Sequence, residues 1–218
     1  MTIALSETGK RFNREWIFRQ LSYTFHAGKA YAITGPNGSG KSTLLQAIAG
    51  SLTISAGKIK YTLQGKEVDP DAVFRHLSIA APYLELIEEM TAVEFLTFHE
   101  KFKPLLPGFT IFEILAKVGL DAAAHKQVRY YSSGMKQRLK LAQAIFSDTQ
   151  VVMLDEPCTN LDATGINLYQ QLIADFGPKR LIIVSSNDPQ EYNFCTEAIH
   201  ILDYKSQAGK NSITNPNA

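Results

Sequence analysis

The sequence predicts a mostly parallel α/β fold with a helical insertion, and three observations support this class. A strand-like segment, a glycine-rich turn and a helix-like segment follow one another over residues 29–50. Between about residues 91 and 146, apolar residues recur at helical spacing. Beyond residue 150, strand-like runs alternate with helical segments, which is the order expected of parallel strands joined by crossover helices.

The N-terminal part is expected to be rich in strands. "LSYTF" (21–25) and "KAYAIT" (29–34) have the composition of short strands, and "KSTLLQAIAG" has that of a helix. "SAGKIKYTLQGKEV" has the pattern of a hairpin, and "HLSIAAPYL" that of a buried strand that runs into a loop. These segments predict an antiparallel β part ahead of the parallel core.

Helices are expected in "TAVEFLTFHEKF", "TIFEILAKVGL" and "GMKQRLKLAQAIF", separated by "KPLLPG", whose prolines and glycine stop a helix. The later strands are expected to be "VVMLD" (151–155), "RLIIVS" (180–185) and "AIHILD" (198–203). We expect one domain over residues 1–205, interrupted by a helical subdomain at about 86–146 and followed by a polar tail, 206–218.

Composition is that of an ordinary globular protein, with 218 residues, 45% of them hydrophobic, and a formal charge of +1. This balance gives no reason to expect a nucleic-acid partner. No apolar run approaches the roughly 20 residues of a membrane span, and the N-terminus lacks a signal peptide, so a cytosolic or peripheral location is expected. Cys158 and Cys195 lack the spacing of a disulfide framework or a metal site, as do the histidines, and free thiols are expected.

"GPNGSGKST" (35–43) fits the phosphate-binding loop pattern G-x-x-x-x-G-K-[ST] and lies between a strand and a helix, as the mechanism requires. Glycines let the backbone approach phosphate closely, so that N–H groups and the helix N-terminus point at the anion. Lys41 is expected to reach the terminal phosphates, and Ser42 to bind Mg²⁺. The candidate nucleotide-binding residues of this loop are Gly35, Pro36, Asn37, Gly38, Ser39, Gly40, Lys41, Ser42 and Thr43.

Asp155 and Glu156 follow directly after a hydrophobic strand, at the sheet edge where α/β proteins bind ligands. An acidic residue there can hold Mg²⁺, and its neighbour can activate the attacking water in phosphoryl transfer. We therefore expect Asp155 to be a metal ligand and Glu156 to be catalytic.

"YYSSGMKQRLKLAQAIF" (130–146) resembles the signature of the ABC transporter ATPases, with serine and methionine in place of one glycine and the glutamine of the family motif. The resemblance implies that Ser132, Ser133 and Gly134 bind the γ-phosphate of an ATP held by a second subunit. Two chains, identical or paralogous, would then enclose two ATP molecules head to tail.

The resemblance extends over nearly the whole chain. "TNLD" (159–162) resembles the segment called the D-loop, which implies a place at the subunit junction for Asp162. "GKRFNREW" resembles the segment whose aromatic ring stacks on adenine. Phe12 stands at the expected distance, Trp16 is the alternative, and either could instead belong to the core. Stacking of this kind contributes about 1–3 kcal/mol per base.

The sequence departs from the family at two positions. The first is a glutamine that contacts Mg²⁺ and the attacking water, and its position falls on Pro82 or Tyr83. Neither can replace an amide, so we expect water or a nearby acid, Glu85 or Glu88, to bind the metal instead, unless these glutamates only form a solvated loop face.

The second departure is Asn187, where the family has a histidine that contacts the γ-phosphate. Asparagine keeps a neutral donor but has shorter reach and does not titrate. Loss of one well-placed donor costs about 10²–10³ in rate. We therefore expect normal ATP binding and slow hydrolysis. Asn187 could in addition cap the helix that begins near Pro189.

The resemblance implies an ATPase subunit of an exporter-like ABC transporter, which binds ATP and Mg²⁺, closes as a dimer and drives separate transmembrane permease subunits from the cytoplasmic face of the membrane. The alternative is a soluble ABC ATPase in assembly, such as the iron–sulfur scaffold type. A translation-factor type would have a second ATPase domain and a basic arm. A GTPase is disfavoured, because "DATG" (162–165) lies far from the loop and N-K-x-D is absent.

Overall fold

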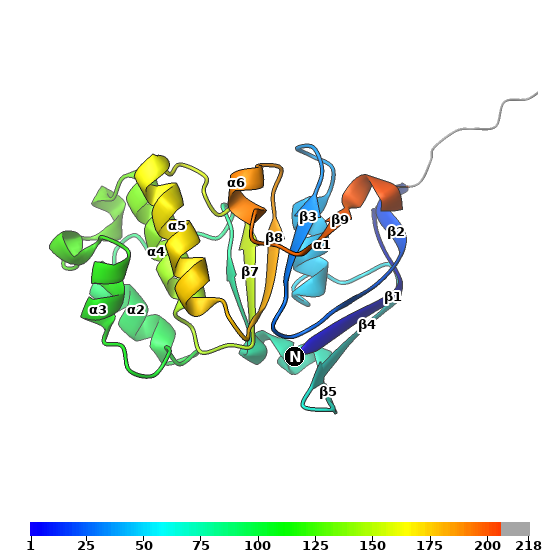
Figure 1. Ribbon diagram of the computed structural model, residues 1–218, viewed down its shortest axis with the longest axis horizontal. Coiled ribbons are helices and arrows are strands. Elements are labelled where there is room, and N and C mark those ends of the chain that lie inside the picture. Colours follow the sequence, from blue (N-terminus) through cyan, green and yellow to red (C-terminus); the bar gives the residue numbers. More distant parts are fainter. Residues whose placement is uncertain (206–218) are drawn as a thin grey trace, which may run out of the picture.

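Two β-sheets and a group of helices make up residues 1–205, the part of the chain that this computed structural model describes (Figure 1). The predicted polar tail, 206–218, lies outside the described residues. The α/β class predicted from the sequence is confirmed. No helix within residues 1–205 combines the length and the apolar character needed to span a membrane.

The five-stranded sheet is parallel and has the order β6-β7-β8-β3-β9. Its strands are β3 (Ala30–Thr34), β6 (Leu77–Ala80), β7 (Val151–Asp155), β8 (Leu181–Ser185) and β9 (Glu197–His200). Every residue of β7 and β8 is buried, as expected of central parallel strands, which are covered on both faces.

Alternate residues of β7 belong to two different hydrophobic cores, because successive side chains of a strand point to opposite faces. Val151 and Met153 pack in the core that contains helix α1 (Lys41–Ile48) and the N-terminal strands. Val152 and Leu154 pack in the core that contains the helical segments between residues 92 and 176. The parallel sheet thus separates the two cores. The loops that follow its strands lie at the carboxyl ends of these strands.

The second sheet is antiparallel, with the order β2-β1-β4-β5, and lies at one end of the molecule (Figure 1). Its strands are β1 (Thr2–Phe12), β2 (Glu15–Phe25), β4 (Ala56–Leu63) and β5 (Lys66–Val68). The predicted hairpin is confirmed: β4 and β5 are joined by Gln64 and Gly65, which both have positive φ, as a tight hairpin turn requires.

Two predicted strands differ in extent. "LSYTF" is the end of a strand that begins at Glu15, because the whole of β2 pairs with β1. "AIHILD" is a strand only to His200; residues Ile201–Tyr204 form a 3₁₀ turn. β9 ends there because its partner β3 ends at Thr34, after which the phosphate-binding loop begins.

The helical part lies at the opposite end of the molecule from the antiparallel sheet (Figure 1). Thr91 and Thr110 begin α2 and α3 with capping boxes, in which a threonine and a glutamate three residues later bond each other's backbone N–H. The helices are α2 (Ala92–Glu100), α3 (Ile111–Lys117), α4 (Ser133–Ile145), α5 (Ala163–Phe176) and α6 (Pro189–Tyr192), with 3₁₀ turns at Pro70–His76, Asp121–Ala123 and Val128–Tyr130.

Candidate functional site

The phosphate-binding loop connects β3 to α1, and its backbone has a shape that only glycine adopts easily. Gly35, Gly38 and Gly40 have φ values of 147°, 73° and 104°. A Cβ on Gly40 would lie 2.2 Å from Cγ2 of Ile17, so a side chain there would collide with β2 as well as strain the backbone. Since Gly40 is the N-cap of α1, the loop leads directly into a helix N-terminus.

Lys41 lies inside this loop rather than in solvent. Only 4% of its surface is exposed, and its Nζ donates to the carbonyl oxygens of Gly35 (3.0 Å) and Pro36 (3.3 Å). The hydroxyl of Ser39 is also buried and has no hydrogen-bond partner in the described part of the chain. The loop therefore holds a cation and a free hydroxyl at its centre, which suits a polyanionic phosphate group.

Asp155 ends β7 opposite Ser185 of β8. It is 1% exposed, and within residues 1–205 neither its carboxylate oxygens nor the Ser185 hydroxyl has a hydrogen-bond partner. A buried carboxylate without partners is costly unless a cation or donor compensates it. Oxygen ligands are those that Mg²⁺ prefers, so the residues at this position fit a magnesium ion.

Glu156 faces the phosphate-binding loop across a pocket of about 230 Å³. Its φ is 44°, a strained conformation for glutamate, and its N–H donates to Ser185 O at 2.8 Å. We call this cavity the phosphate-binding pocket. Its lining residues are Ile17, Asn37, Gly38, Gly40, Lys41, Ser42, Thr43 and Glu156.

The loop after β6 brings Tyr83 close enough to Asp155 for the carboxylate charge to act on its phenol, and Pro82 lines a separate pocket together with Glu85 and Lys140. Partial burial raises the pKa of the Tyr83 phenol to about 12, the charge of Asp155 adds to the rise, and a hydrogen bond from the Gln46 side chain opposes it. The phenol of Tyr83 therefore lies near the Asp155 carboxylate, in the segment where the family pattern has a glutamine.

The two glutamates considered as substitute metal ligands lie elsewhere. Glu88 forms an ion pair with Lys136 of α4, and Glu85 lines a pocket of about 320 Å³ together with that lysine and Lys140. Neither lines the phosphate-binding pocket.

Asn187 follows β8 and contacts the phosphate-binding loop: its Nδ2 donates to Oδ1 of Asn37 at 3.1 Å. The prediction that Asn187 also caps the next helix is wrong. Asp188 is the N-cap of α6, accepting the N–H of Gln190 at 2.9 Å. Asp188 performs the capping, and the Asn187 side chain contacts the loop instead.

Ser132 and Asp162 are the N-caps of the adjacent helices α4 and α5. Ser132 accepts the N–H of Met135 at 3.2 Å, and Asp162 that of Gly165 at 2.8 Å. Between the two helix starts lies a cavity of about 400 Å³, the signature pocket, whose lining includes no residue of the phosphate-binding loop. Its lining residues are Ser132, Ser133, Gly134, Arg138, Asn160, Leu161, Asp162, Thr164, Gly165 and Leu168.

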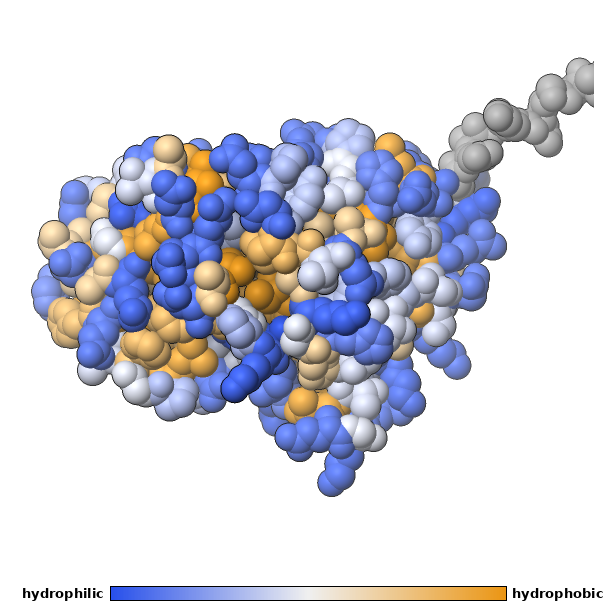
Figure 2. All heavy atoms as spheres, in the orientation of Figure 1, coloured by the Kyte–Doolittle hydropathy of each residue, from blue (hydrophilic) through white to orange (hydrophobic). Residues whose placement is uncertain are grey.

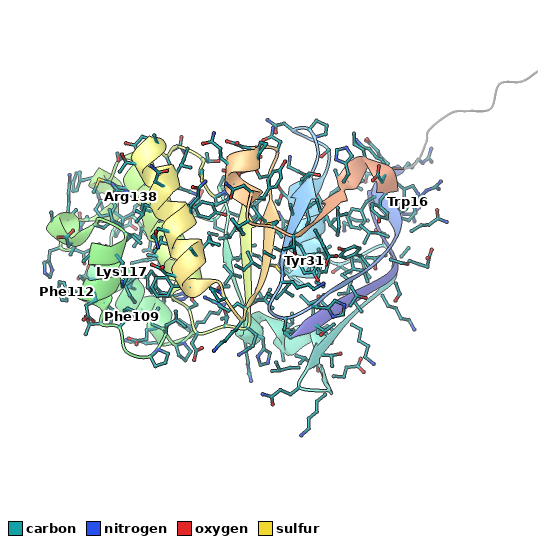
Figure 3. All side chains as sticks on the ribbon, in the orientation of Figure 1. Trp16, Tyr31, Phe109, Phe112, Lys117 and Arg138 are labelled. Atoms are coloured by element: carbon teal, nitrogen blue, oxygen red, sulfur yellow. The ribbon has the colours of Figure 1, made fainter. Side chains whose placement is uncertain are left out.

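The two aromatic candidates for adenine stacking differ in packing. Phe12 is 48% exposed at the end of β1, with Nζ of Lys10 4.8 Å from its ring centre. Trp16 packs on Gly9, where a Cβ would lie 2.8 Å from its ring, and it lies at the far end of the molecule from Arg138 (Figure 3). Phe12 is therefore the more exposed of the two rings.

Sequence reasoning missed Ile17, which lines the phosphate-binding pocket from β2. An apolar residue in a strand carries no motif, and only the pairing of β2 with β1 shows where it points.

A further hollow of about 580 Å³ lies between α5 and the edge of the parallel sheet, where Figure 2 shows apolar side chains gathered. None of the candidate residues lines it.

Comparison with known proteins agrees with this geometry. The model of the ABC transporter family matches residues 18–159, more than half of the chain. The chain is 31% identical over 195 residues to the cytochrome c biogenesis ATP-binding export protein CcmA of Agrobacterium fabrum, covering 87% of this chain and 90% of that protein. It is 29% identical over 195 residues to the ABC transporter ATP-binding protein YybJ of Bacillus subtilis, covering 88% of each. It is 37% identical over 166 residues to YxlF of the same organism, but spans 55% of that protein's length and 75% of its own.

Solved structures show the same fold. An ABC transporter ATP-binding protein from Pyrococcus furiosus superposes with a TM-score of 0.79 at 19% identity, over 94% of this chain and 100% of that one. A dimeric ATP-binding cassette, MJ0796 bound to ADP and Pi, superposes with a TM-score of 0.77 at 21% identity, over 91% and 93%. From the family match, the relative at 31% identity and the fold, we conclude that this chain belongs to the ABC transporter family and carries its ATP-hydrolysing domain.

Proposed function

We propose that this chain is the ATP-binding subunit of an exporter-type transporter, and that it drives separate membrane permease subunits by ATP-dependent closure of a dimer at the inner face of the cell membrane. The relatives include proteins described as a cytochrome c biogenesis export protein and a lantibiotic transport protein, which supports export. In this proposal residues 1–205 form one ATPase domain, with residues 86–146 as its helical subdomain.

The observation that carries the proposal is the separation of the two pockets. The phosphate-binding pocket holds the lysine and Glu156, whereas the signature pocket holds a helix N-terminus and exposed hydroxyl groups, and the two share no lining residue. A helix N-terminus favours an anion. A second copy or a paralogue, placed with its signature pocket against the first chain's phosphate-binding pocket, would complete each nucleotide site.

In the closed dimer, Phe12 stacks on adenine and the loop from Gly35 to Thr43 binds the phosphates. Lys41 neutralises phosphate charge, and Ser42 with Asp155 would hold Mg²⁺, which would supply positive charge to the developing transition state. Glu156 orients and deprotonates the attacking water. Ser132, Ser133 and Gly134 bind the γ-phosphate from the second subunit, with Asp162 at the junction.

Closure is the step that does work, and hydrolysis resets it. In this proposal Asn187 stands at the position of the histidine of the family pattern, Pro82 or Tyr83 stands at that of the glutamine, and hydrolysis is slow for this reason. Asn187 reaches Asn37 at the rim of the phosphate-binding pocket, with a neutral donor only.

The test is the oligomeric state of Glu156→Gln, measured by light scattering after size exclusion, with ATP and Mg²⁺ or with ADP and Mg²⁺. We expect a dimer with ATP and a monomer with ADP, because binding persists while hydrolysis stops. A variant that binds ATP but remains monomeric at high concentration, with and without membranes that contain its permease, contradicts the dimer. Co-purification with a soluble scaffold protein instead of a multi-span membrane protein would indicate the assembly class of ABC ATPase.

A further inference from the structure

A buried carboxylate that the proposed chemistry does not use lies behind the catalytic turn. Glu191, on α6, is 4% exposed, and its Oε1 accepts the backbone N–H of Cys158 at 2.6 Å. Burial raises its pKa, while hydrogen bonds from the Ser186 side chain and the Cys158 N–H oppose the rise. Within residues 1–205, Glu191 takes part in no salt bridge. A buried acid retained without a cation needs a role for its acceptor oxygens.

The turn that Glu191 contacts is the one that carries Glu156. A second buried side chain, Gln137 of α4, donates from Nε2 to the carbonyl oxygen of Pro157 at 2.7 Å and is also 4% exposed. Two different helices therefore hold the two residues after Glu156: Gln137 of α4 bonds the carbonyl oxygen of Pro157, and Glu191 of α6 bonds the N–H of Cys158.

The turn needs such support because Glu156 has a φ of 44°. A glutamate keeps a left-handed backbone conformation only where the surroundings over-determine it. The bond from the Glu156 N–H to Ser185 O holds the start of the turn, and the bonds from Glu191 and Gln137 hold its end. Released at that end, the backbone can relax and move the Glu156 carboxylate away from the phosphate-binding pocket.

We propose that Glu191 and Gln137 are positioning residues for ATP hydrolysis, which hold the turn after Glu156 so that its carboxylate faces the phosphate-binding pocket. This inference rests on the proposed catalytic role of Glu156. It also ties the turn to two segments that contact nucleotide: α6 begins two residues after Asn187, and Gln137 lies one turn after the signature residues of α4.

The experiment measures kcat and KM for ATP, with nucleotide affinity and thermal unfolding, for Glu191→Ala, Glu191→Gln and Gln137→Met. We expect Glu191→Ala and Gln137→Met to lower kcat by about 10- to 100-fold and to change KM by less than about twofold, because a displaced catalytic group costs rate rather than binding. Glu191→Gln should return kcat to within about threefold of the unmodified chain, since its amide oxygen can still accept the Cys158 N–H.

The control is Glu113→Ala, which removes a glutamate from the capping box of α3 and leaves the turn intact. It should lower thermal stability without changing kcat. α6 is expected to stay in place in Glu191→Ala, because the Tyr169 hydroxyl bonds the main-chain oxygen of Glu191 at 2.7 Å. Should that variant fail to fold, Gln137→Met tests the same turn.

Wild-type kcat in both Glu191→Ala and Gln137→Met, or an equal loss in Glu191→Gln and Glu191→Ala, overturns the inference. Glu156→Gln distinguishes failure of this inference from failure of the proposed catalytic role of Glu156. If it abolishes turnover while the positioning variants do not change kcat, only the inference fails; if it leaves turnover intact, the proposed role of Glu156 fails first.

Discussion

The phosphate-binding pocket and the signature pocket are built differently, although a helix N-terminus takes part in both. The first contains the buried Lys41, 4% exposed, and its lining residue Glu156 directly follows Asp155, which is 1% exposed and whose oxygens have no hydrogen-bond partner within residues 1–205. The second opens between the caps of α4 and α5, where Ser132, Ser133 and Asp162 are exposed. A buried, charged site can bind a ligand within one chain, whereas an exposed cap contributes most once a second surface excludes water from it.

This difference teaches that binding and turnover depend on different parts of the molecule. Changes in the phosphate-binding pocket should alter ATP affinity in the isolated chain. Changes in the signature pocket should leave that affinity unchanged and alter turnover, because turnover in our proposal needs the closed dimer.

The largest effect is expected for Lys41→Ala. Loss of a buried cation that contacts phosphate typically costs 2–5 kcal/mol, so ATP affinity should fall at least about 30-fold. Equilibrium titration with a fluorescent ATP analogue measures it. The matched control is Lys103→Ala. Lys103 is also part-buried, but it follows α2, and its Nζ donates to Leu77 O at 2.6 Å. An equal loss of affinity in both variants would mean that Lys41 acts only through stability.

Ser132→Ala should lower turnover by about tenfold while changing ATP affinity less than about twofold, because it removes a donor that reaches nucleotide only across the dimer. Thr110→Ala is the matched control, since both residues are helix N-caps with the same 3.2 Å bond to a backbone N–H. Both variants should lose about 0.5–2 kcal/mol of stability. Steady-state kinetics and urea unfolding distinguish them, and equal turnover in the two would contradict a role of Ser132 beyond capping.

Asn187→His should raise turnover, by about tenfold, if the missing charge-stabilising donor limits the rate. The same exchange at the exposed Asn193, which lies at the C-terminal end of α6, should leave turnover unchanged. Single-turnover hydrolysis at excess enzyme is the measurement. Unmodified protein that already hydrolyses ATP at ordinary transporter rates, with no gain from the histidine, would show that the asparagine suffices.

The smallest effect concerns acid stability of the helical part. His99 joins α2 to Gln143 of α4 and to Ser147, and burial, with the charge of Lys103, lowers the pKa of His99 from 6.5 to about 4. Between these values the unfolded chain binds a proton that the folded chain does not, so stability falls as the pH drops from 6.5 to 4.

This difference should amount to on the order of 1–2 kcal/mol, since the imidazole is only partly buried. Urea unfolding at pH 7 and pH 4.5 measures it, and His99→Gln should reduce the loss, whereas the exposed His125→Gln should not. An identical pH dependence in both variants would exclude His99 as the cause.

Predictions from sequence succeeded where a structural feature depends only on residues within one short segment. The glycines between β3 and α1 announce a loop with positive φ, and Gln64–Gly65 between two strand-like runs joins a hairpin. The helices expected in "TAVEFLTFHEKF" and "TIFEILAKVGL" form, and the structure shows that each begins with a capping box made by a Thr-x-x-Glu pair. In each case the interacting groups are close in sequence, so local physical chemistry is sufficient to specify them.

Predictions failed or were silent where the partner lies far along the chain. The extent of β9 depends on β3, more than 160 residues earlier, and the choice of Asp188 over Asn187 as the cap depends on the loop that Asn187 reaches. Ile17 and Gly40 meet only because β2 folds over the start of α1. No periodicity in the sequence marks these contacts.

By itself the sequence determined the α/β class, the phosphate-binding loop, the acidic pair and the family, because each rests on a local pattern of backbone freedom, charge and periodicity. Only the tertiary structure decided which groups from distant segments meet: Tyr83 beside Asp155, Asn187 on Asn37, and Glu191 with Gln137 on the turn of Glu156. Burial and long-range hydrogen bonding arise when distant segments pack, and these give the side chains their roles.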